Sequence, residues 1–109
     1  GILARTKVME DRAVQAGLKS GDLCFPMLYA PEFLKKEFKS AVADMRNSVK
    51  DRMNAQASCA GHFIESNIDK EYKGDYLHID MAGPQSKSDG RATGYGVALI
   101  LSLCSAPGF

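Results

Sequence analysis

The chain has 109 residues, 45% of them hydrophobic and 25% charged, which is the composition of an ordinary globular domain. Fourteen Lys and Arg against thirteen Asp and Glu leave a formal charge of +1. A surface that follows nucleic-acid phosphates needs a basic excess, so we expect no nucleic-acid partner. The longest apolar stretch, residues 97–104, is far shorter than the ~20 residues that span a bilayer, so we expect no membrane partner.

The cysteine pattern argues against a disulfide-stabilised secreted scaffold. Cys24, Cys59 and Cys104 are odd in number and widely separated. A reducing compartment is the simpler interpretation, and we therefore expect a cytoplasmic protein.

The first third of the chain predicts a strand, a helix and an extended connector. Residues 1–5 are apolar from the second position without a cap or turn, a pattern typical of a buried strand inside a larger domain. Residues 8–18 carry acids early and are followed by Lys19, which suits a helix dipole, and Gly21 ends that helix. Residues 23–30 contain Pro26 and indicate an edge element.

The rest of the chain alternates helices, loops and one further strand. The expected elements are a helix over 32–40 started by Pro31, an extended segment over 41–47, a small-residue helix over 57–67, a strand over 76–81 and a helix ending near Cys104. Residues 69–75 and 82–90 are expected to be loops, and the second follows a strand, where functional side chains are common. This mixture predicts an α/β fold.

Two local clusters have residue types that suit chemistry. Cys59, His62 and Glu65 share one helix face, as metal ligands or a thiol with its base would require, but the neighbouring Ala and Gly favour a buried Cys and a boundary His. His78 and Asp80 lie two apart on a strand and suit two metal ligands, or a base with its orienting carboxylate. The alternative is that they hydrogen-bond backbone and hold the following loop.

The Gly-rich run at residues 90–96 opens the last helix, where free amide groups attract anions. It lacks the Lys-Ser or Lys-Thr of a phosphate loop and the spacing of a dinucleotide fingerprint. The run instead favours Thr93 as the helix N-cap, with Gly94 and Gly96 allowing close passage of the backbone.

Several separated motifs resemble the final third of the leucyl (cytosol) aminopeptidases. The order and the gaps between the motifs also match, over essentially the whole chain. The sequence looks closest to the branch with Asn-Ala-Gln before the small-residue helix, here Asn54, Ala55 and Gln56. The motifs are SAVADMRNS at 40–48, SCAGHFI at 58–64, LHIDMAGP at 77–84 and RATGYGV at 91–97.

The resemblance implies an α/β fold with a mixed sheet flanked by helices, in which residues 1–109 form the C-terminal portion of a metallo-aminopeptidase catalytic domain. Such enzymes release N-terminal residues from peptides with two divalent ions, zinc, manganese or magnesium. The family's metal-binding and catalytic residues have no counterpart here, so they are expected upstream in the same protein. His78 and Asp80 then hold a loop and are not metal ligands.

The resemblance also assigns substrate-binding positions. Ala82 and Gln85 correspond to the loop after the strand, and Ser48 to the segment before the small-residue helix, which together help line the site for the N-terminal side chain. Gln85 and Ser48 are polar where well-known members have apolar residues. Because a buried amide left unpaired is costly, we expect a tolerant or more polar pocket than one for leucine.

The family's assembly implies a homo-hexamer in which catalytic domains pack toward the centre. A free segment should then expose a large apolar patch. Two other functions remain open from the residues: a catalytically silent structural or interaction subunit, and a free-standing hydrolase that uses Cys59 and His62.

Overall fold

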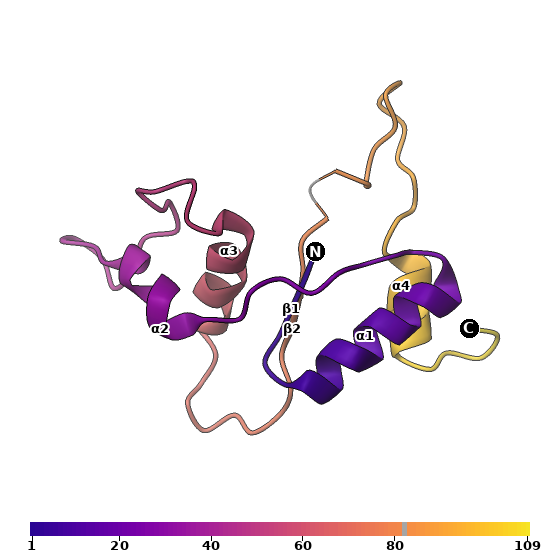
Figure 1. Ribbon diagram of the computed structural model, residues 1–109, viewed down its shortest axis with the longest axis horizontal. Coiled ribbons are helices and arrows are strands. Elements are labelled where there is room, and N and C mark those ends of the chain that lie inside the picture. Colours follow the sequence, from indigo (N-terminus) through magenta and orange to yellow (C-terminus); the bar gives the residue numbers. More distant parts are fainter. Residues whose placement is uncertain (82) are drawn as a thin grey trace.

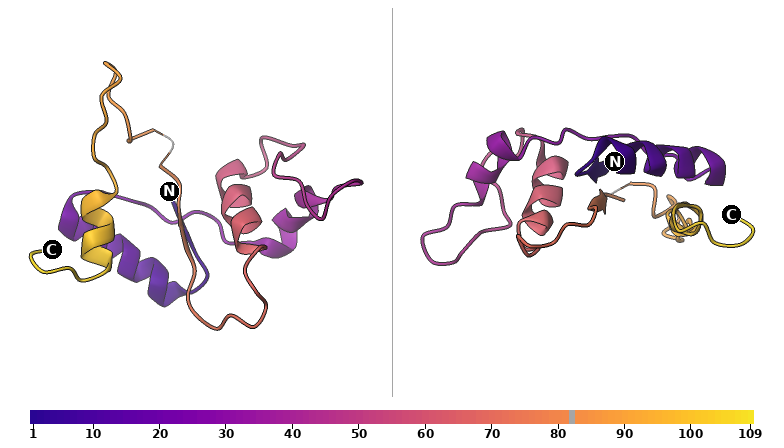
Figure 2. Two further views of the ribbon diagram at one scale, coloured as in Figure 1. Left: turned by 180° about the vertical axis from the view of Figure 1, so that it is seen from behind. Right: turned by 90° about the horizontal axis from the view of Figure 1, so that it is seen from below.

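A computed structural model describes residues 1–81 and 83–109. A small sheet occupies the middle, with helices in two groups on opposite sides of it (Figure 1). The molecule is flat, with extents of 48 × 39 × 19 Å, and Figure 2 shows the thin dimension. The elements are β1 Ile2–Ala4, α1 Lys7–Ser20, α2 Pro31–Leu34, the 3-10 helix η1 Lys35–Phe38, α3 Gln56–Glu65, β2 Leu77–Ile79 and α4 Val97–Leu103.

The strand β1 lies between two extended segments. It pairs antiparallel with β2, with Leu3 opposite His78. On the other side the Ile2 amide donates to the Phe25 carbonyl and its carbonyl accepts from the Met27 amide, at 2.8 and 2.7 Å, in a parallel bridge. Ile2 and Leu3 are fully buried. The predicted buried strand and the edge element containing Pro26 are thereby confirmed. The sheet among the described residues has two antiparallel strands, to which the Pro26 segment adds one parallel bridge.

The helix predicted over residues 8–18 is α1, which begins one residue earlier than expected and ends at Gly21 as predicted. Thr6 is the N-cap and its hydroxyl accepts from the Met9 amide at 3.2 Å. Gly21 is the C-cap, at φ 82°, a left-handed conformation that glycine adopts without steric cost. Ala13, Ala16 and Gly17 form its buried face, which admits a closely packed neighbour.

The helix α4 lies against α1, and its N-terminus is capped from a distant part of the chain. One carboxylate oxygen of Asp22 accepts from the Gly96 and Leu99 amides at 3.0 and 3.1 Å. The prediction of Thr93 as the N-cap is therefore wrong, because the helix begins four residues later and Asp22 takes the free amides. Gly94 and Gly96 have φ angles of 76° and 95°, which glycine adopts without steric cost. The predicted close passage of the backbone is not found: a Cβ added to Gly94 meets nothing within 4 Å, and one added to Gly96 meets the side chain of Met81.

The predicted helix over 32–40 is shorter and less regular than expected. It starts at Pro31, as predicted, but tightens into a 3-10 turn after Leu34 and ends at Phe38. The segment 41–47 forms bends and not a strand. The Ser40 hydroxyl accepts from the Val42 and Ala43 amides, a local bond that competes with an extended conformation.

A small core joins η1 to α3. It contains Leu34, Phe38, Val49 and Cys59, with Phe63 packed edge to face on Phe38 at a centroid distance of 5.7 Å. This core positions α3 over one face of the sheet. No helix among the described residues has the length and apolar character needed to cross a membrane.

Candidate functional site

Two adjoining hollows lie between α3 and β2, and we call them together the α3–β2 groove. The first, of about 350 Å³, is lined by Asn47, Ala60, Phe63, Ile64 and His78. The second, of about 470 Å³, is lined by Gln56, Ala57, Ala60 and Asp80. Ala60 contributes to both. The groove therefore runs from the segment before α3 to the end of the strand that precedes the 83–96 segment.

Two of the three predicted substrate-binding residues, Ser48 and Gln85, lie in the segments at the ends of this groove. Ser48 is exposed and directly follows Asn47, which lines the first hollow. Gln85 is exposed in the arm that projects from the sheet at the top of Figure 1. Ala82 lies outside the described residues. The structure thus places Ser48 beside one end of the groove and Gln85 beyond the other end, and the two residues contribute no lining atoms of their own.

His78 and Asp80 both line the groove, one in each hollow. The His78 ring lies against α3, and a Cβ added to Gly61 would approach its Cδ2 to 3.2 Å. Burial lowers the pKa of His78, while the Asp80 charge acts in the opposite direction. The Asp80 amide and carbonyl pair with Gly1 and extend the sheet by one residue pair. The backbone of Asp80 thus fixes the point where the following segment leaves the sheet.

Behind the groove, α3 presents a buried carboxylate to three donors. Glu65 Oε1 accepts from Arg5 Nε at 2.9 Å and from the Tyr29 hydroxyl at 2.8 Å. Glu65 Oε2 accepts from His62 Nδ1 at 3.1 Å. We call Arg5, Tyr29, His62 and Glu65 the Glu65 cluster. It connects β1, the 23–30 connector and α3 through a single side chain.

The hydrogen bonds of His62 define its tautomer. Its Nε2 lies 3.1 Å from the Ala30 amide, which can only donate, so Nε2 accepts and Nδ1 carries the proton that it donates to Glu65. Burial acts to raise the pKa of Glu65, but the bonds from Tyr29, Arg5 and His62 outweigh it and leave that pKa below its usual value. Burial and the Glu65 carboxylate raise the pKa of Tyr29 to about 12. The cluster is therefore ionised at Glu65 and neutral at Tyr29 at neutral pH.

The predicted alignment of Cys59, His62 and Glu65 divides into two separate environments. His62 and Glu65 bond each other, whereas the Cys59 thiol donates to the Asn54 carbonyl at 3.3 Å inside the apolar core. Both nitrogens of His62 are occupied by other partners, so the imidazole does not act on the thiol. The buried Cys is confirmed, but His62 is fully buried and not at a boundary as expected.

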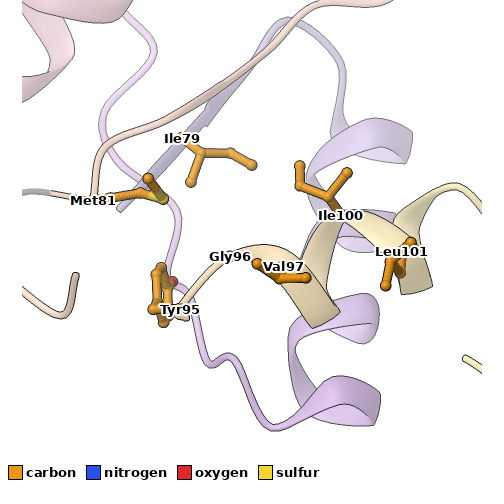
Figure 3. Close-up of a pocket in the computed structure, with 7 residues that line it drawn as sticks. All are labelled: Ile79, Met81, Tyr95, Gly96, Val97, Ile100 and Leu101. Atoms are coloured by element: carbon orange, nitrogen blue, oxygen red, sulfur yellow. The ribbon is translucent and has the colours of Figure 1, made fainter. Parts of the chain in front are cut away.

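A third hollow, the α4 pocket, lies at the base of the projecting arm. It has a volume of about 560 Å³ and is lined by Ile79, Met81, Tyr95, Gly96, Val97, Ile100 and Leu101. Figure 3 shows Ile79 and Met81 from the β2 side of the pocket and Val97, Ile100 and Leu101 from α4. Its lining is almost entirely apolar. Val97 is 63% exposed and Ile100 45%, so this face is open to a further apolar surface.

The described residues do not provide a metal centre. They contain no group of three or more His, Cys, Asp or Glu side chains that can hold a metal ion. His78 and Asp80 supply two such side chains to the groove, fewer than the three or four convergent donors that a protein metal site uses.

Sequence reasoning identified His62 and Glu65 by their helical spacing but missed Arg5, Tyr29 and Asp22. The partners of these three lie 60, 36 and 74 or more residues away in the chain. A local sequence pattern does not predict hydrogen bonds between residues so far apart in the chain. One sequence signal was present. The small residues of α3 predict that the helix is buried, and a charged side chain buried there needs a hydrogen-bonding or charged partner.

The sequence matches a known family model. Residues 1–101 match the catalytic domain of the cytosol aminopeptidase family. The "Probable aminopeptidase NPEPL1" of Homo sapiens is 49% identical over 102 residues, which cover 94% of this chain and 19% of that protein. "Leucine aminopeptidase 1" of Caenorhabditis elegans is 42% identical over 96 residues, which cover 87% of this chain and 19% of that protein.

Comparison with solved structures indicates the same family. The leucyl aminopeptidase of Leishmania major, in complex with actinonin, superposes with a TM-score of 0.87 at 43% identity, over 94% of this chain and 19% of that one. The leucyl aminopeptidase of Trypanosoma cruzi superposes with a TM-score of 0.88 at 46% identity, over 94% of this chain and 20% of that one. The chain spans about a fifth of the length of these relatives. It belongs to the cytosol aminopeptidase family and has the fold of part of the family's catalytic domain.

Proposed function

We propose that this chain is the C-terminal portion of the catalytic domain of a metal-dependent aminopeptidase, which releases N-terminal amino acids from peptides. The family match over residues 1–101 is the observation that carries the proposal. The superposition on the aminopeptidases of Leishmania major and Trypanosoma cruzi at more than 40% identity supports it. In this proposal the chain supplies one wall of the substrate site, part of the domain core and contacts to other subunits.

The substrate wall consists of Ser48, Ala82 and Gln85, which we propose to contact the side chain of the substrate's N-terminal residue. The α3–β2 groove supports this arrangement, because its ends lie at Asn47 and Asp80, next to the segments that carry these residues. The amide of Gln85 and the hydroxyl of Ser48 favour a side chain that can pair with them, and disfavour a purely apolar one.

Two divalent ions, zinc, manganese or magnesium, supply such enzymes with Lewis-acid activation when bound. The described residues do not fit a metal site, since they contain no suitable group of three donors. We therefore propose that the ligands lie on the upstream part of the same protein. This chain's contribution is to bind and orient the peptide substrate beside them.

The overall activity is tested by comparing two preparations. The full-length protein should hydrolyse aminoacyl amides, contain divalent metal and lose activity on treatment with a chelator, while residues 1–109 alone should show neither activity nor stoichiometric metal. A full-length protein without activity and metal would instead support the silent structural subunit. Activity that resists chelators but is lost to thiol reagents would support a cysteine hydrolase.

The pocket assignment is tested with Gln85→Met in the full-length enzyme. We expect the ratio of kcat/KM for leucyl over glutaminyl amide substrates to rise roughly tenfold, since an amide that a bound leucyl side chain covers without pairing costs about 1–3 kcal/mol. Lys87→Met, on the same arm two residues away, is the matched control and should leave the ratio unchanged. An unchanged ratio in Gln85→Met would remove Gln85 from the pocket.

We further propose a cytoplasmic homo-hexamer. Its support is the apolar surface that this chain leaves open: the side chains of Val8, Leu18, Phe25, Leu28, Phe33 and Val97 are each more than 60% exposed. The upstream part of the protein and neighbouring subunits are the proposed covers of this surface. The three free cysteines are consistent with a reducing compartment. Sedimentation of the full-length protein tests the oligomeric state.

A further inference from the structure

The arm formed by residues 83–96 projects from the sheet (Figures 1 and 2), and one antiparallel bridge between Ser86 and Ala92 sets the register of its two sides. The Thr93 amide donates to the Gln85 carbonyl at 3.0 Å, and the Lys87 amide donates to the Arg91 carbonyl at 2.8 Å. These bonds alternate along the two sides of the hairpin as in an antiparallel ladder. Gln85 therefore lies directly opposite Thr93, and the side chains of such a pair project to the same face.

The hydroxyl of Thr93 forms a second link to the same segment. It donates to the Pro84 carbonyl and accepts from the Tyr95 amide, the latter at 3.1 Å. A hydroxyl can fill both roles because it has one donor and two acceptor positions. Through its amide and its side chain, Thr93 thus holds the carbonyls of two consecutive residues, Pro84 and Gln85.

The other side of Thr93 is tied to the body of the molecule. The Tyr95 hydroxyl donates to the Leu23 carbonyl at 2.8 Å, and the next amide, that of Gly96, donates to Asp22 at 3.0 Å. A continuous series of hydrogen bonds therefore runs from the turn after α1, through Tyr95 and Thr93, to the backbone of Gln85. Thr93 is the point in this series that joins the two sides of the hairpin to the body of the molecule.

We propose that Thr93 is a positioning residue for the substrate pocket, which fixes where the side-chain amide of Gln85 is presented. This inference rests on the proposed function, in which Gln85 contacts the substrate's N-terminal side chain. Thr93 itself is exposed, so its hydrogen bonds contribute little to the stability of the fold. Their consequence is the placement of Gln85, and a displacement of about 1 Å suffices to weaken substrate recognition.

The test uses the full-length enzyme and the ratio of kcat/KM for leucyl over glutaminyl amide substrates. Thr93→Val keeps the branched shape and removes the hydroxyl, and we expect it to shift this ratio roughly three- to tenfold in the same direction as Gln85→Ala. Thr93→Ser restores the hydroxyl and should return the ratio to within about twofold of wild type. Thr6→Val is the matched control: it removes a capping hydroxyl from α1, and should lower Tm without moving the ratio.

A double-mutant cycle distinguishes positioning from a general structural effect. If Thr93 acts through Gln85, then Thr93→Val produces no further shift of the ratio when Gln85 is already Ala. Independent, multiplicative shifts would overturn the inference, as would an unchanged ratio in Thr93→Val.

The cycle also separates this inference from the proposed function. An active enzyme in which Gln85→Ala changes the ratio and Thr93→Val does not overturns only the role of Thr93. An active enzyme in which Gln85→Ala leaves the ratio unchanged overturns the pocket assignment and this inference together. An inactive full-length protein overturns the proposed function itself.

Discussion

The imidazole of His62 donates to the carboxylate of Glu65, one turn later in α3, while its other nitrogen accepts from the Ala30 amide. This pair fixes the side of α3 that faces the 23–30 connector, because both residues are buried and bond to Ala30 and Tyr29. The opposite side of the helix then lines the α3–β2 groove. A polar contact behind the helix thus determines the shape of the candidate site in front of it.

Glu65→Gln is expected to destabilise the full-length protein by about 2–4 kcal/mol, because the substitution leaves Arg5 without its anion in a partly buried site. Chemical denaturation followed by circular dichroism measures the change. Glu10→Gln is the matched control, since that carboxylate pairs with the exposed Lys7 and should matter far less. Equal losses in the two variants would contradict the importance of the Glu65 cluster.

The advantage of wild type over Glu65→Gln is expected to depend on pH. The folded pKa of Glu65 lies below its ordinary value of 4.5, so the unfolded chain binds the proton more tightly. The stabilisation is complete above about pH 4.5 and is lost as the pH falls toward and through the folded pKa. Denaturation of both variants between pH 7 and pH 3 measures the difference, and a constant gap across that range would contradict the prediction.

Gly61→Ala is expected to destabilise the protein by about 1–3 kcal/mol despite the better helix propensity of alanine. A Cβ at this position would lie 2.5 Å from Leu3 Cδ2, and Leu3 is fully buried in β1. Gly83→Ala serves as the control, because no atom lies within 4 Å of its added Cβ. A Tm for Gly61→Ala at or above that of wild type would show that the contact between α3 and the sheet can relax.

Asp22→Ala is expected to cost about 1 kcal/mol of unfolding free energy, since two amides at the start of α4 lose their acceptor. Asp22→Asn should recover part of the loss because its amide oxygen can still accept. Thermal unfolding measures both variants. Asp44→Ala, at an exposed position, provides the comparison, and a similar small effect at both positions would argue against the cap.

Cys59 is expected to resist thiol reagents at neutral pH in the folded protein. Burial raises the pKa of its thiol, and the nearby Glu37 charge acts in the same direction, so little thiolate forms. Mass spectrometry after brief labelling should find Cys59 modified only when denaturant is present. Native labelling of Cys59 as rapid as that of a free thiol would contradict this buried environment.

The sequence predicted the elements whose signals are local. The C-terminal end of α1 depends on Gly21 next to the helix, and the buried character of β1 follows from its uninterrupted apolar run. The helix after Pro31 was predicted too long, because Glu32 to Ser40 suits a helix while packing of Leu34 and Phe38 against α3 selects a tighter turn. Helix propensity, which depends on the local sequence, does not predict a turn that is selected by packing against α3.

The site was predictable only where family resemblance supplied it. Ser48, Ala82 and Gln85 came from position within motifs, since a polar residue in a loop carries no chemical signature of its own. The hydrogen bonds of Thr93 explain why its role differed from the predicted one. A threonine in a glycine-rich run before a helix favours capping. The sequence near Thr93 does not indicate that Asp22 accepts from the Gly96 and Leu99 amides at the start of α4.

The short strand β1 has a mechanical consequence. The helices α1 and α4 contact each other on one side of it, and α2, η1 and α3 contact each other on the other side. Among the described residues the two groups meet at the sheet, where β1 packs on α1 and Leu3 of β1 lies against Gly61 of α3. A load applied to α4 or to its arm therefore reaches α3 chiefly through the two short strands β1 and β2 and the connector beside them, and the stiffness of the described residues depends on this narrow bridge.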